Sequence, residues 1–217
     1  LVVVVSAGNN GPGAGTINKP ADDPFVLTVG AVRDNTTPGR GDDTVASFSG
    51  TGPTAANGLA KPDIAAPGGS VVSSRVPGSY VDSAFPSARV GTAYFKGSGT
   101  SFAAAVASAS AALVLDRTPA LTPDQVKARL VDTAAAGPVT DRSKVGAGWL
   151  DAYAATMSDS TRAANQGLVP STGAGSLQLS RGSLADNIQT GTVVNALQQE
   201  LNPGYPSEQR AVGGEKD

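Results

Sequence analysis

The feature that most constrains the fold is a run without a single charged residue, residues 102–115. Most of its positions hold Ala, Ser or Val, and the run is shorter than the ~18 apolar residues that cross a membrane. Such a run predicts a helix that is buried on nearly all sides. Its small side chains would let neighbouring strands approach closely, so we expect strands packed against this helix.

Two near-continuous apolar runs predict those strands. Residues 1–5, Leu-Val-Val-Val-Val, and residues 25–32 both indicate strands of a sheet that is covered on both faces. Shorter extended pieces are predicted around residues 46–49, 63–66 and 71–72. Together they favour an α/β domain, a three-layer sandwich with a mostly parallel sheet. Because the chain begins inside a strand, we expect it to supply the C-terminal part of such a domain, with the N-terminal part missing.

Helix signals follow the uncharged run. Residues 122–125, Thr-Pro-Asp-Gln, combine a capping Thr, a Pro at the first helical position and a Gln that completes a capping box. A helix is therefore predicted to start there, with Val126, Leu130 and Ala134 on its inner face. A further short helix is predicted near Asp151.

The pattern weakens beyond Met157, and we place a domain boundary there. Residues 1–157 are assigned to the α/β domain and residues 158–217 to an extension. Within the extension, residues 193–201 form one amphipathic piece. Residues 202–217 are rich in Pro, Gly and charge, so a disordered tail or a truncated linker is predicted for them.

Composition excludes several classes of function. The chain has no Cys, which removes thiol catalysis and Cys-ligated metals, and no His, which removes the usual general base. A net charge of −2 and a charged fraction of 16% give no basic field for nucleic acid. No segment is long and apolar enough for a membrane span, and the first residues lack the basic start of a signal peptide.

The strongest local signal for chemistry is residues 97–103, Gly-Ser-Gly-Thr-Ser-Phe-Ala. Its glycines turn the chain into the uncharged helix and leave Ser101 at the helix N-terminus, where free amides and the helix dipole stabilise negative charge. The alternative is that Thr100 or Ser101 only caps the helix. Asn9, which follows Ser-Ala-Gly, has the alternative role of a turn residue that tolerates left-handed dihedrals.

The residues around Ser101, Gly99-Thr100-Ser101-Phe102-Ala103, resemble the serine motif Gly-Thr-Ser-x-Ala of the subtilisin-like serine peptidases, or subtilases. Four further segments resemble motifs of this family in the same order. They are Ser6-Ala7-Gly8-Asn9, Val29-Gly30-Ala31-Val32 with Ala46-Ser47-Phe48-Ser49, Lys61-Pro62-Asp63-Ile64-Ala65-Ala66-Pro67-Gly68, and Gly146-Ala147-Gly148-Trp149-Leu150-Asp151-Ala152. Five ordered motifs are far less expected by chance than any one of them.

The resemblance implies a serine-type endopeptidase that hydrolyses peptide bonds of a polypeptide substrate through an acyl-enzyme. Ser101 would be the nucleophile, and the Asn9 side chain would bind the oxyanion together with the Ser101 backbone N–H. Glycines of the first loop would line the substrate cleft, and residues 18–21 would close the far side of the primary specificity pocket. The substrate-binding residues would be Gly8, Gly99, Thr100 and Asn18.

In this family the catalytic Asp and His precede the Ser, so both would lie upstream of Leu1. The isolated chain is then expected to be inactive, and its first partner would be the missing N-terminal part of the same domain. The resemblance also implies secretion and a propeptide. It requires no cofactor, and no metal site is assigned, although Asp22-Asp23 and Asp42-Asp43 leave room for a structural calcium ion.

Three positions depart from the family pattern, since Ala105, Val106 and Ala109 stand where the family usually has Pro, often His, and later Gly. One rival function stays open, and another is disfavoured. A non-catalytic pseudo-peptidase that binds peptides would explain the missing His. An α/β-hydrolase esterase requires a His after the serine, and none follows Ser101. The glycines of residues 8–15 lack the spacing of a nucleotide-binding loop.

Overall fold

The computed structural model describes residues 1–35 and 37–169, and its main sheet is built around strand β2 (Leu27–Arg33). Strand β2 pairs in parallel with β1 (Val4–Ser6) on one side and with β4 (Ile64–Pro67) on the other. A short strand, β3 (Thr44–Val45), adds antiparallel pairing at the end of β2. The prediction of a mostly parallel sheet is confirmed. The pieces expected at 193–201 and 202–217 lie outside the described residues.

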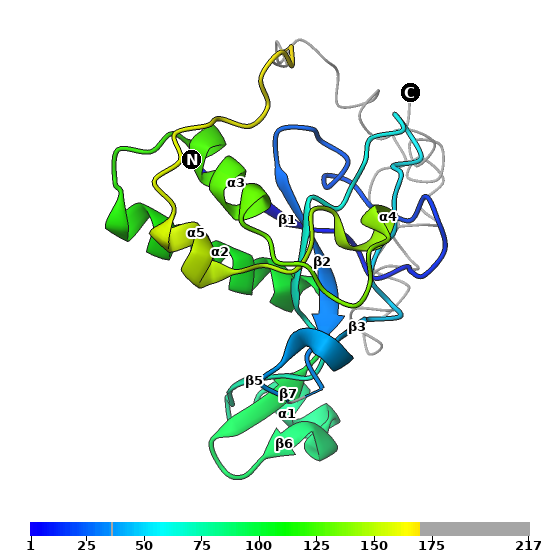
Figure 1. Ribbon diagram of the computed structural model, residues 1–217. Coiled ribbons are helices and arrows are strands. Elements are labelled where there is room, and N and C mark those ends of the chain that lie inside the picture. Colours follow the sequence, from blue (N-terminus) through cyan, green and yellow to red (C-terminus); the bar gives the residue numbers. More distant parts are fainter. Residues whose placement is uncertain (36, 170–217) are drawn as a thin grey trace, which may run out of the picture. The chain divides into compact units, whose positions relative to one another are not determined.

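Alternate residues of β2 face two different layers of helix. Leu27, Val29 and Ala31 point into a core formed with α2 (Thr100–Arg117), α3 (Pro123–Asp132) and α5 (Ala152–Met157). On the opposite face Val32 packs with Trp149 and with Val145 of α4 (Arg142–Val145). Figure 1 shows α2, α3 and α5 to the left of β2 and α4 to the right. The three-layer α/β architecture is therefore confirmed.

The helix boundaries follow the capping signals of the sequence. Thr122 and Gln125 form the expected reciprocal capping box at the start of α3, and Val126 and Leu130 are buried on its inner face. Asp151 caps α5 by accepting a hydrogen bond from the Ala154 N–H. A cap of this kind stabilises a helix by about 1 kcal/mol.

Two predicted strands differ in the structure. Strand β1 is parallel, as expected, but it is only partly buried, because it pairs with β2 alone and is an edge strand among the described residues. Residues 46–49 form a turn instead of a strand. The Ser49 N–H bonds the Ala46 carbonyl, and the Ser49 hydroxyl accepts from the Ala31 N–H of β2. That hydroxyl bond to the backbone replaces a ladder bond and ends the extended conformation.

The uncharged run does form a long helix, α2, but one of its faces is exposed. Residues on the opposite face, such as Ala103, Ala107 and Val114, pack against the sheet. The expectation of burial on nearly all sides is therefore wrong for this structure, because no described element covers the outer face. None of the described helices is long and apolar enough to span a membrane.

A second, antiparallel sheet precedes α2. Its strands β5 (Val71–Ser74), β6 (Arg89–Val90) and β7 (Tyr94–Gly97) are ordered β5-β7-β6. Between β5 and β6 the chain forms α1 (Tyr80–Ala84) and a 3-10 turn at Pro86–Ala88. Another 3-10 turn, Arg40–Asp42, precedes β3. The sequence predicted only the start of β5.

Candidate active site at the carboxyl end of the sheet

Ser101 lies in the first turn of α2, next to the carboxyl end of β4. The helix is capped by Gly99, without a side-chain cap, so neither Thr100 nor Ser101 serves as the N-cap residue. Ser101 is exposed, and its side chain has no hydrogen-bond partner within the described part of the chain. Its hydroxyl is thus available at a helix N-terminus that favours negative charge.

The turn before Ser101 is held in place by the segment after β4. The Gly99 N–H donates to the Gly68 carbonyl at 2.8 Å, and the Ser70 N–H donates to the Ser98 hydroxyl at 2.8 Å. A Cβ on Gly68 would lie 2.8 Å from the Gly99 carbonyl oxygen, closer than such atoms approach. Gly68 is therefore required for the close packing that fixes the position of Ser101.

Asn9 lies in the loop after β1, and α2 fixes the orientation of its amide. The Asn9 Oδ1 accepts hydrogen bonds from the Thr100 N–H at 2.9 Å and from the Thr100 hydroxyl at 2.8 Å. Because a backbone N–H can only donate, the oxygen of the amide must face Thr100 and the NH₂ group must point elsewhere. The backbone of Asn9 is not in the left-handed conformation that would suit its alternative role as a turn residue.

The Asn9 amide nitrogen and the Ser101 backbone nitrogen both lie close to Gly99, next to the Phe102 ring. Measured from the point where a Cβ on Gly99 would sit, Nδ2 of Asn9 lies at 3.7 Å and the nitrogen of Ser101 at 3.8 Å. Neither group has an acceptor among the described residues. Two unsatisfied donors beside a hydroxyl form the arrangement that binds the oxyanion of an attacked carbonyl.

Of the four residues expected to bind substrate, two belong directly to this cluster. Gly99 lies next to both donors, and Thr100 is fully buried with its hydroxyl engaged by Asn9. Gly8 and Asn18 meet next to Asn9. With φ +96° at Gly8, a Cβ there would lie 2.7 Å from the Asn18 amide nitrogen. The structure thus brings all six expected site residues to one end of the sheet.

No general base accompanies Ser101 in the described residues. The whole sequence contains no His, and no charged residue occurs between Gly97 and Leu115. The described chain therefore presents an exposed hydroxyl beside two N–H donors without acceptors, and it lacks a histidine that could remove the proton of the hydroxyl.

Three of the four aspartates considered for calcium are engaged by protein donors. Asp22 pairs with Lys19 at 2.7 Å, Asp23 accepts from the Phe25 N–H at 2.7 Å, and Asp42 accepts from the Thr37 hydroxyl at 2.7 Å. In the described ranges, no group of three or more acidic or other ligand side chains is placed to hold a metal ion.

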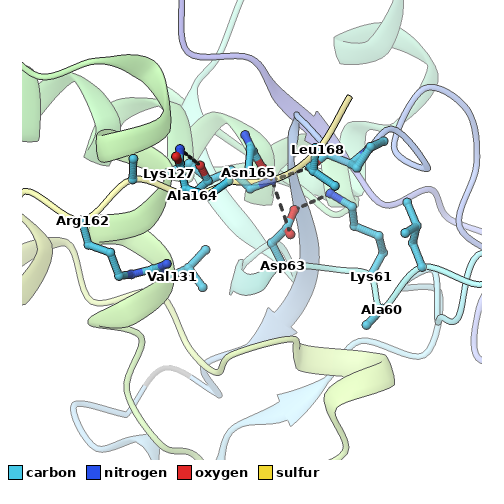
Figure 2. Close-up of a pocket in the computed structure, with 13 residues that line it drawn as sticks. Ala60, Lys61, Asp63, Lys127, Val131, Arg162, Ala164, Asn165 and Leu168 are labelled. Atoms are coloured by element: carbon cyan, nitrogen blue, oxygen red, sulfur yellow. Dashed lines mark hydrogen bonds and ion pairs between the residues drawn. The ribbon is translucent and has the colours of Figure 1, made fainter. Parts of the chain in front are cut away.

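A second cluster, at the amino end of the parallel strands, was not recognised as a unit from the sequence. Asp63, just before β4, accepts from the Thr28 N–H at 2.6 Å and from Lys61 at 2.8 Å, and Lys127 of α3 lies 3.8 Å away. These side chains form part of the wall of a cavity of about 610 Å³, where Figure 2 shows Lys61 and Asp63 in contact. Burial lowers the pKa of Lys127 to about 8.

Residues 158–168 also belong to this amino end. The Ala164 N–H donates to the Asp124 carbonyl at 2.9 Å, and Asn165 accepts from Lys127 at 2.9 Å. Ser160 accepts from Arg129 at 2.8 Å. The first part of the expected extension is thus tied to α3, a feature that its polar composition did not indicate.

Comparisons with known proteins agree on one family. The subtilase family profile, peptidase family S8, matches residues 1–175. The serine protease AprX of Bacillus subtilis (strain 168) is 47% identical over 152 residues, which are 70% of this chain and 34% of AprX.

Solved structures show the same similarity. Fervidolysin from Fervidobacterium pennivorans, a keratinolytic enzyme related to subtilisin, matches with a TM-score of 0.54 and 28% identity over 73% of this chain and 22% of its own. A protease from Pseudoalteromonas arctica matches with a TM-score of 0.53 and 30% identity over 71% of this chain and 42% of its own. The chain spans about a third of AprX and less than half of these two enzymes. It belongs to the subtilase family of serine peptidases.

Proposed function

We propose that the protein is a serine endopeptidase with Ser101 as its nucleophile. One observation carries the proposal, namely that the exposed Ser101 hydroxyl lies beside two N–H donors, the Asn9 amide and the Ser101 backbone N–H, that have no acceptor among the described residues. A helix cap or a turn residue needs no such pair of free donors. A carbonyl that becomes negatively charged during attack does need them.

The chemistry follows from this arrangement. The Ser101 oxygen attacks the scissile carbonyl carbon, its proton passes to a histidine, and the carbonyl oxygen becomes an oxyanion bound by Asn9 and the Ser101 N–H. The carbon–nitrogen bond then breaks, and the histidine returns the proton to the leaving amine. Water, deprotonated by the same histidine, hydrolyses the ester on Ser101 and restores the serine.

We assign the histidine, and the aspartate that orients it, to an upstream part of the protein. Two surfaces of the described chain are open to such a part. The free edge of β1 offers unpaired backbone groups, and the exposed face of α2 carries Ser101, Ala105, Ser108 and Ala112 at helical spacing. Small residues let another part of the protein pack closely against this face. A histidine on that part would then reach Ser101. The isolated chain is then expected to lack activity.

The family resemblance alone supports the remaining parts of the proposal. These are secretion of the protein and a propeptide that acts as a partner before maturation. A structural calcium ion would have to displace the protein donors that engage Asp22, Asp23 and Asp42.

The test is reaction of the whole protein with a fluorophosphonate probe, followed by mapping of the labelled serine. We expect the label on Ser101 and hydrolysis of a chromogenic peptide, with both lost in Ser101→Ala. Ser87→Ala, which changes an exposed serine in the Pro86–Ala88 turn, is the matched control and should leave both unchanged. Labelling that persists in Ser101→Ala contradicts the proposal. Peptide binding without labelling would identify a pseudo-peptidase instead.

A further inference from the structure

The end of strand β2 is joined to the turn before Ser101 by three residues, Gly68-Gly69-Ser70, which we call the connecting segment. The N–H groups of both glycines donate to the Val32 carbonyl of β2, each at 3.0 Å. The first carbonyl of the segment accepts from the Gly99 N–H at 2.8 Å, and its last N–H donates to the Ser98 hydroxyl at 2.8 Å. The connecting segment therefore bonds the sheet on one side and the turn before α2 on the other.

The side chain of Arg33, the last residue of β2, lies across this segment. A Cβ on Gly69 would overlap the Cγ of Arg33, so only glycine lets the arginine side chain pass there. Beyond Gly69, the Arg33 Nη1 donates to the Ser70 hydroxyl at 3.3 Å. Arg33 has no ion pair within the part of the chain that the structure describes. Its guanidinium is therefore directed to the connecting segment and not to a neighbouring carboxylate.

Ser70 has a backbone conformation that suits glycine better than serine. Its φ is +60°, in the left-handed region, which is unfavourable for a residue with a Cβ. Such a conformation persists only where the surrounding contacts determine it. Here the N–H bond to Ser98 and the hydroxyl bond from Arg33 hold the residue from two sides. A glycine would relieve the strain but would offer Arg33 no hydroxyl.

These bonds form a chain that leads from the sheet to the candidate active site. Arg33 bonds Ser70, Ser70 bonds Ser98, and Ser98 directly precedes Gly99, the N-cap of α2. The N–H of Ser101 lies two residues further on. A donor must be held within about 0.5 Å of its productive position to stabilise a transition state. A small shift of this turn would therefore weaken the oxyanion bond more than it would weaken binding of the whole substrate.

We propose that Arg33 is a positioning residue for Ser101 and acts through the Ser70 hydroxyl. The inference rests on the peptidase function proposed above, because it assigns Arg33 a role in that reaction. Arg33 then affects turnover by fixing the connecting segment, without contact with the substrate. The strain at Ser70 is the cost of placing a hydroxyl where Arg33 can bond it.

The experiment measures hydrolysis of a chromogenic peptide by variants of the whole protein. Arg33→Met keeps an unbranched stem but removes the donors, and Ser70→Ala removes the acceptor. Each should lower kcat about fivefold with KM unchanged, the factor that corresponds to one ordinary hydrogen bond. The double variant should lose no more than either single variant, because both substitutions remove the same bond. Arg33→Lys keeps a donor and should recover most of the turnover.

Arg142→Met is the matched control, because it removes an exposed arginine of α4 and should leave kcat unchanged. Losses from Arg33→Met and Ser70→Ala that multiply in the double variant would overturn the inference, since the two residues would then act separately. So would an Arg33→Lys variant that is no more active than Arg33→Met, because the loss would then come from packing.

Ser70→Gly separates positioning from stability. Glycine relieves the left-handed strain and removes the hydroxyl, so the Tm should not fall, whereas kcat should fall about fivefold, as in Ser70→Ala. Normal turnover in Ser70→Gly would show that the hydroxyl does not position the Ser101 turn. A fall of kcat that accompanies a lower Tm would mean that Ser70 acts only through stability, and would equally overturn the inference.

Amide hydrogen exchange separates this inference from the proposed hydrolysis. In Arg33→Met, the amide hydrogens of Ser70 and Gly99 should exchange about fivefold faster, while that of Ala31 in β2 should be unchanged. This result is expected whether or not the protein cleaves peptides. Unchanged exchange at Ser70 and Gly99, in a variant that cleaves the chromogenic peptide normally, would refute the role of Arg33 and leave the peptidase proposal intact.

Discussion

The two ends of the parallel strands differ in whether their polar groups have hydrogen-bond partners. At the carboxyl end, the Asn9 amide NH₂ and the Ser101 N–H have no acceptor among the described residues. At the amino end, Lys61, Asp63 and Lys127 are charged and nearly buried, and they are hydrogen bonded to the backbone or to one another.

On the proposed function, this difference separates a site for chemistry from a site for stability. Donors without partners cost stability, and they persist where a ligand or a transition state completes them. Saturated charges hold strands and helices in register but offer nothing to a substrate. The amino-end cavity is large, yet each of its lysines already bonds a backbone carbonyl. Substitutions at the amino end should accordingly lower the free energy of unfolding, and substitutions at the carboxyl end should lower turnover.

The largest effect is expected from Asp63→Asn. The change keeps the shape of the side chain but removes the carboxylate that is paired with the buried Lys61 and Lys127, so the free energy of unfolding should fall by about 3–5 kcal/mol. Urea unfolding of the whole protein measures this loss. Asp159→Asn, which removes the exposed partner of Arg117 at 3.8 Å, should cost less than about 1 kcal/mol. Equal losses of unfolding free energy in the two variants would show that the amino-end cluster stabilises the fold no more than an exposed ion pair does.

Asn9→Ala should act on turnover instead. We expect kcat to fall about 10²–10³-fold with little change in KM, a magnitude carried over from the corresponding asparagine of subtilisin. Asn165→Ala is the matched change at the amino end, where Asn165 bonds Lys127 and Asp124. It should lower stability and leave turnover unchanged. A comparable loss of turnover in both variants would remove the distinction between the two ends.

Thr100→Val tests how Asn9 is positioned. The variant retains the backbone N–H bond to Asn9 but loses the hydroxyl bond at 2.8 Å, so kcat should fall about tenfold with KM unchanged. Thr100→Ser restores a hydroxyl and should restore most of the activity. If serine does not rescue turnover, the effect of valine comes from packing and Thr100 is not a positioning residue.

The smallest effect concerns the pH dependence of stability. Burial lowers the pKa of Lys127 from its ordinary 10.5 to about 8, while Asp63 opposes this shift and Lys61 adds to it. Between pH 8 and 10.5 the unfolded chain keeps this proton and the folded chain has released it, so raising the pH favours folding. The slope is at most about 1.4 kcal/mol per pH unit for one proton. Lys127→Met should remove this rise in the free energy of unfolding with pH. An unchanged slope in the variant would show that the buried Lys127 does not cause it.

Local signals in the sequence predicted the parts that depend on neighbouring residues. The capping box at Thr122, the buried strand β2 and the serine at a helix start all follow from periodicity and turn chemistry within a few residues. The geometry of the site could not be predicted from such local signals, because the hydrogen bond that orients Asn9 joins residues 91 positions apart. The motif resemblance identified both residues, but only the fold shows that Thr100 holds the amide of Asn9.

Other features could not be predicted because tertiary contacts override local propensity. Residues 46–49 look extended, but the Ser49 hydroxyl bonds β2 and closes a turn. The segment 71–97 depends on the buried Asp82 and two arginines, and hydrophobic periodicity does not detect a buried carboxylate of this kind. The exposed face of α2 could not be inferred either, since an uncharged run gives no sign of which side is left uncovered.

The most direct test of the account is a crystal structure of the whole protein after reaction with a phosphonate inhibitor. The tetrahedral phosphorus of the adduct imitates the carbon that Ser101 would attack, and its oxygen imitates the oxyanion. We predict a covalent bond to the Ser101 oxygen, with the phosphonyl oxygen about 2.7–3.1 Å from both the Asn9 amide nitrogen and the Ser101 backbone nitrogen. An adduct on another serine, or one whose oxygen points away from Asn9, would contradict the assignment of chemistry to the carboxyl end of the sheet.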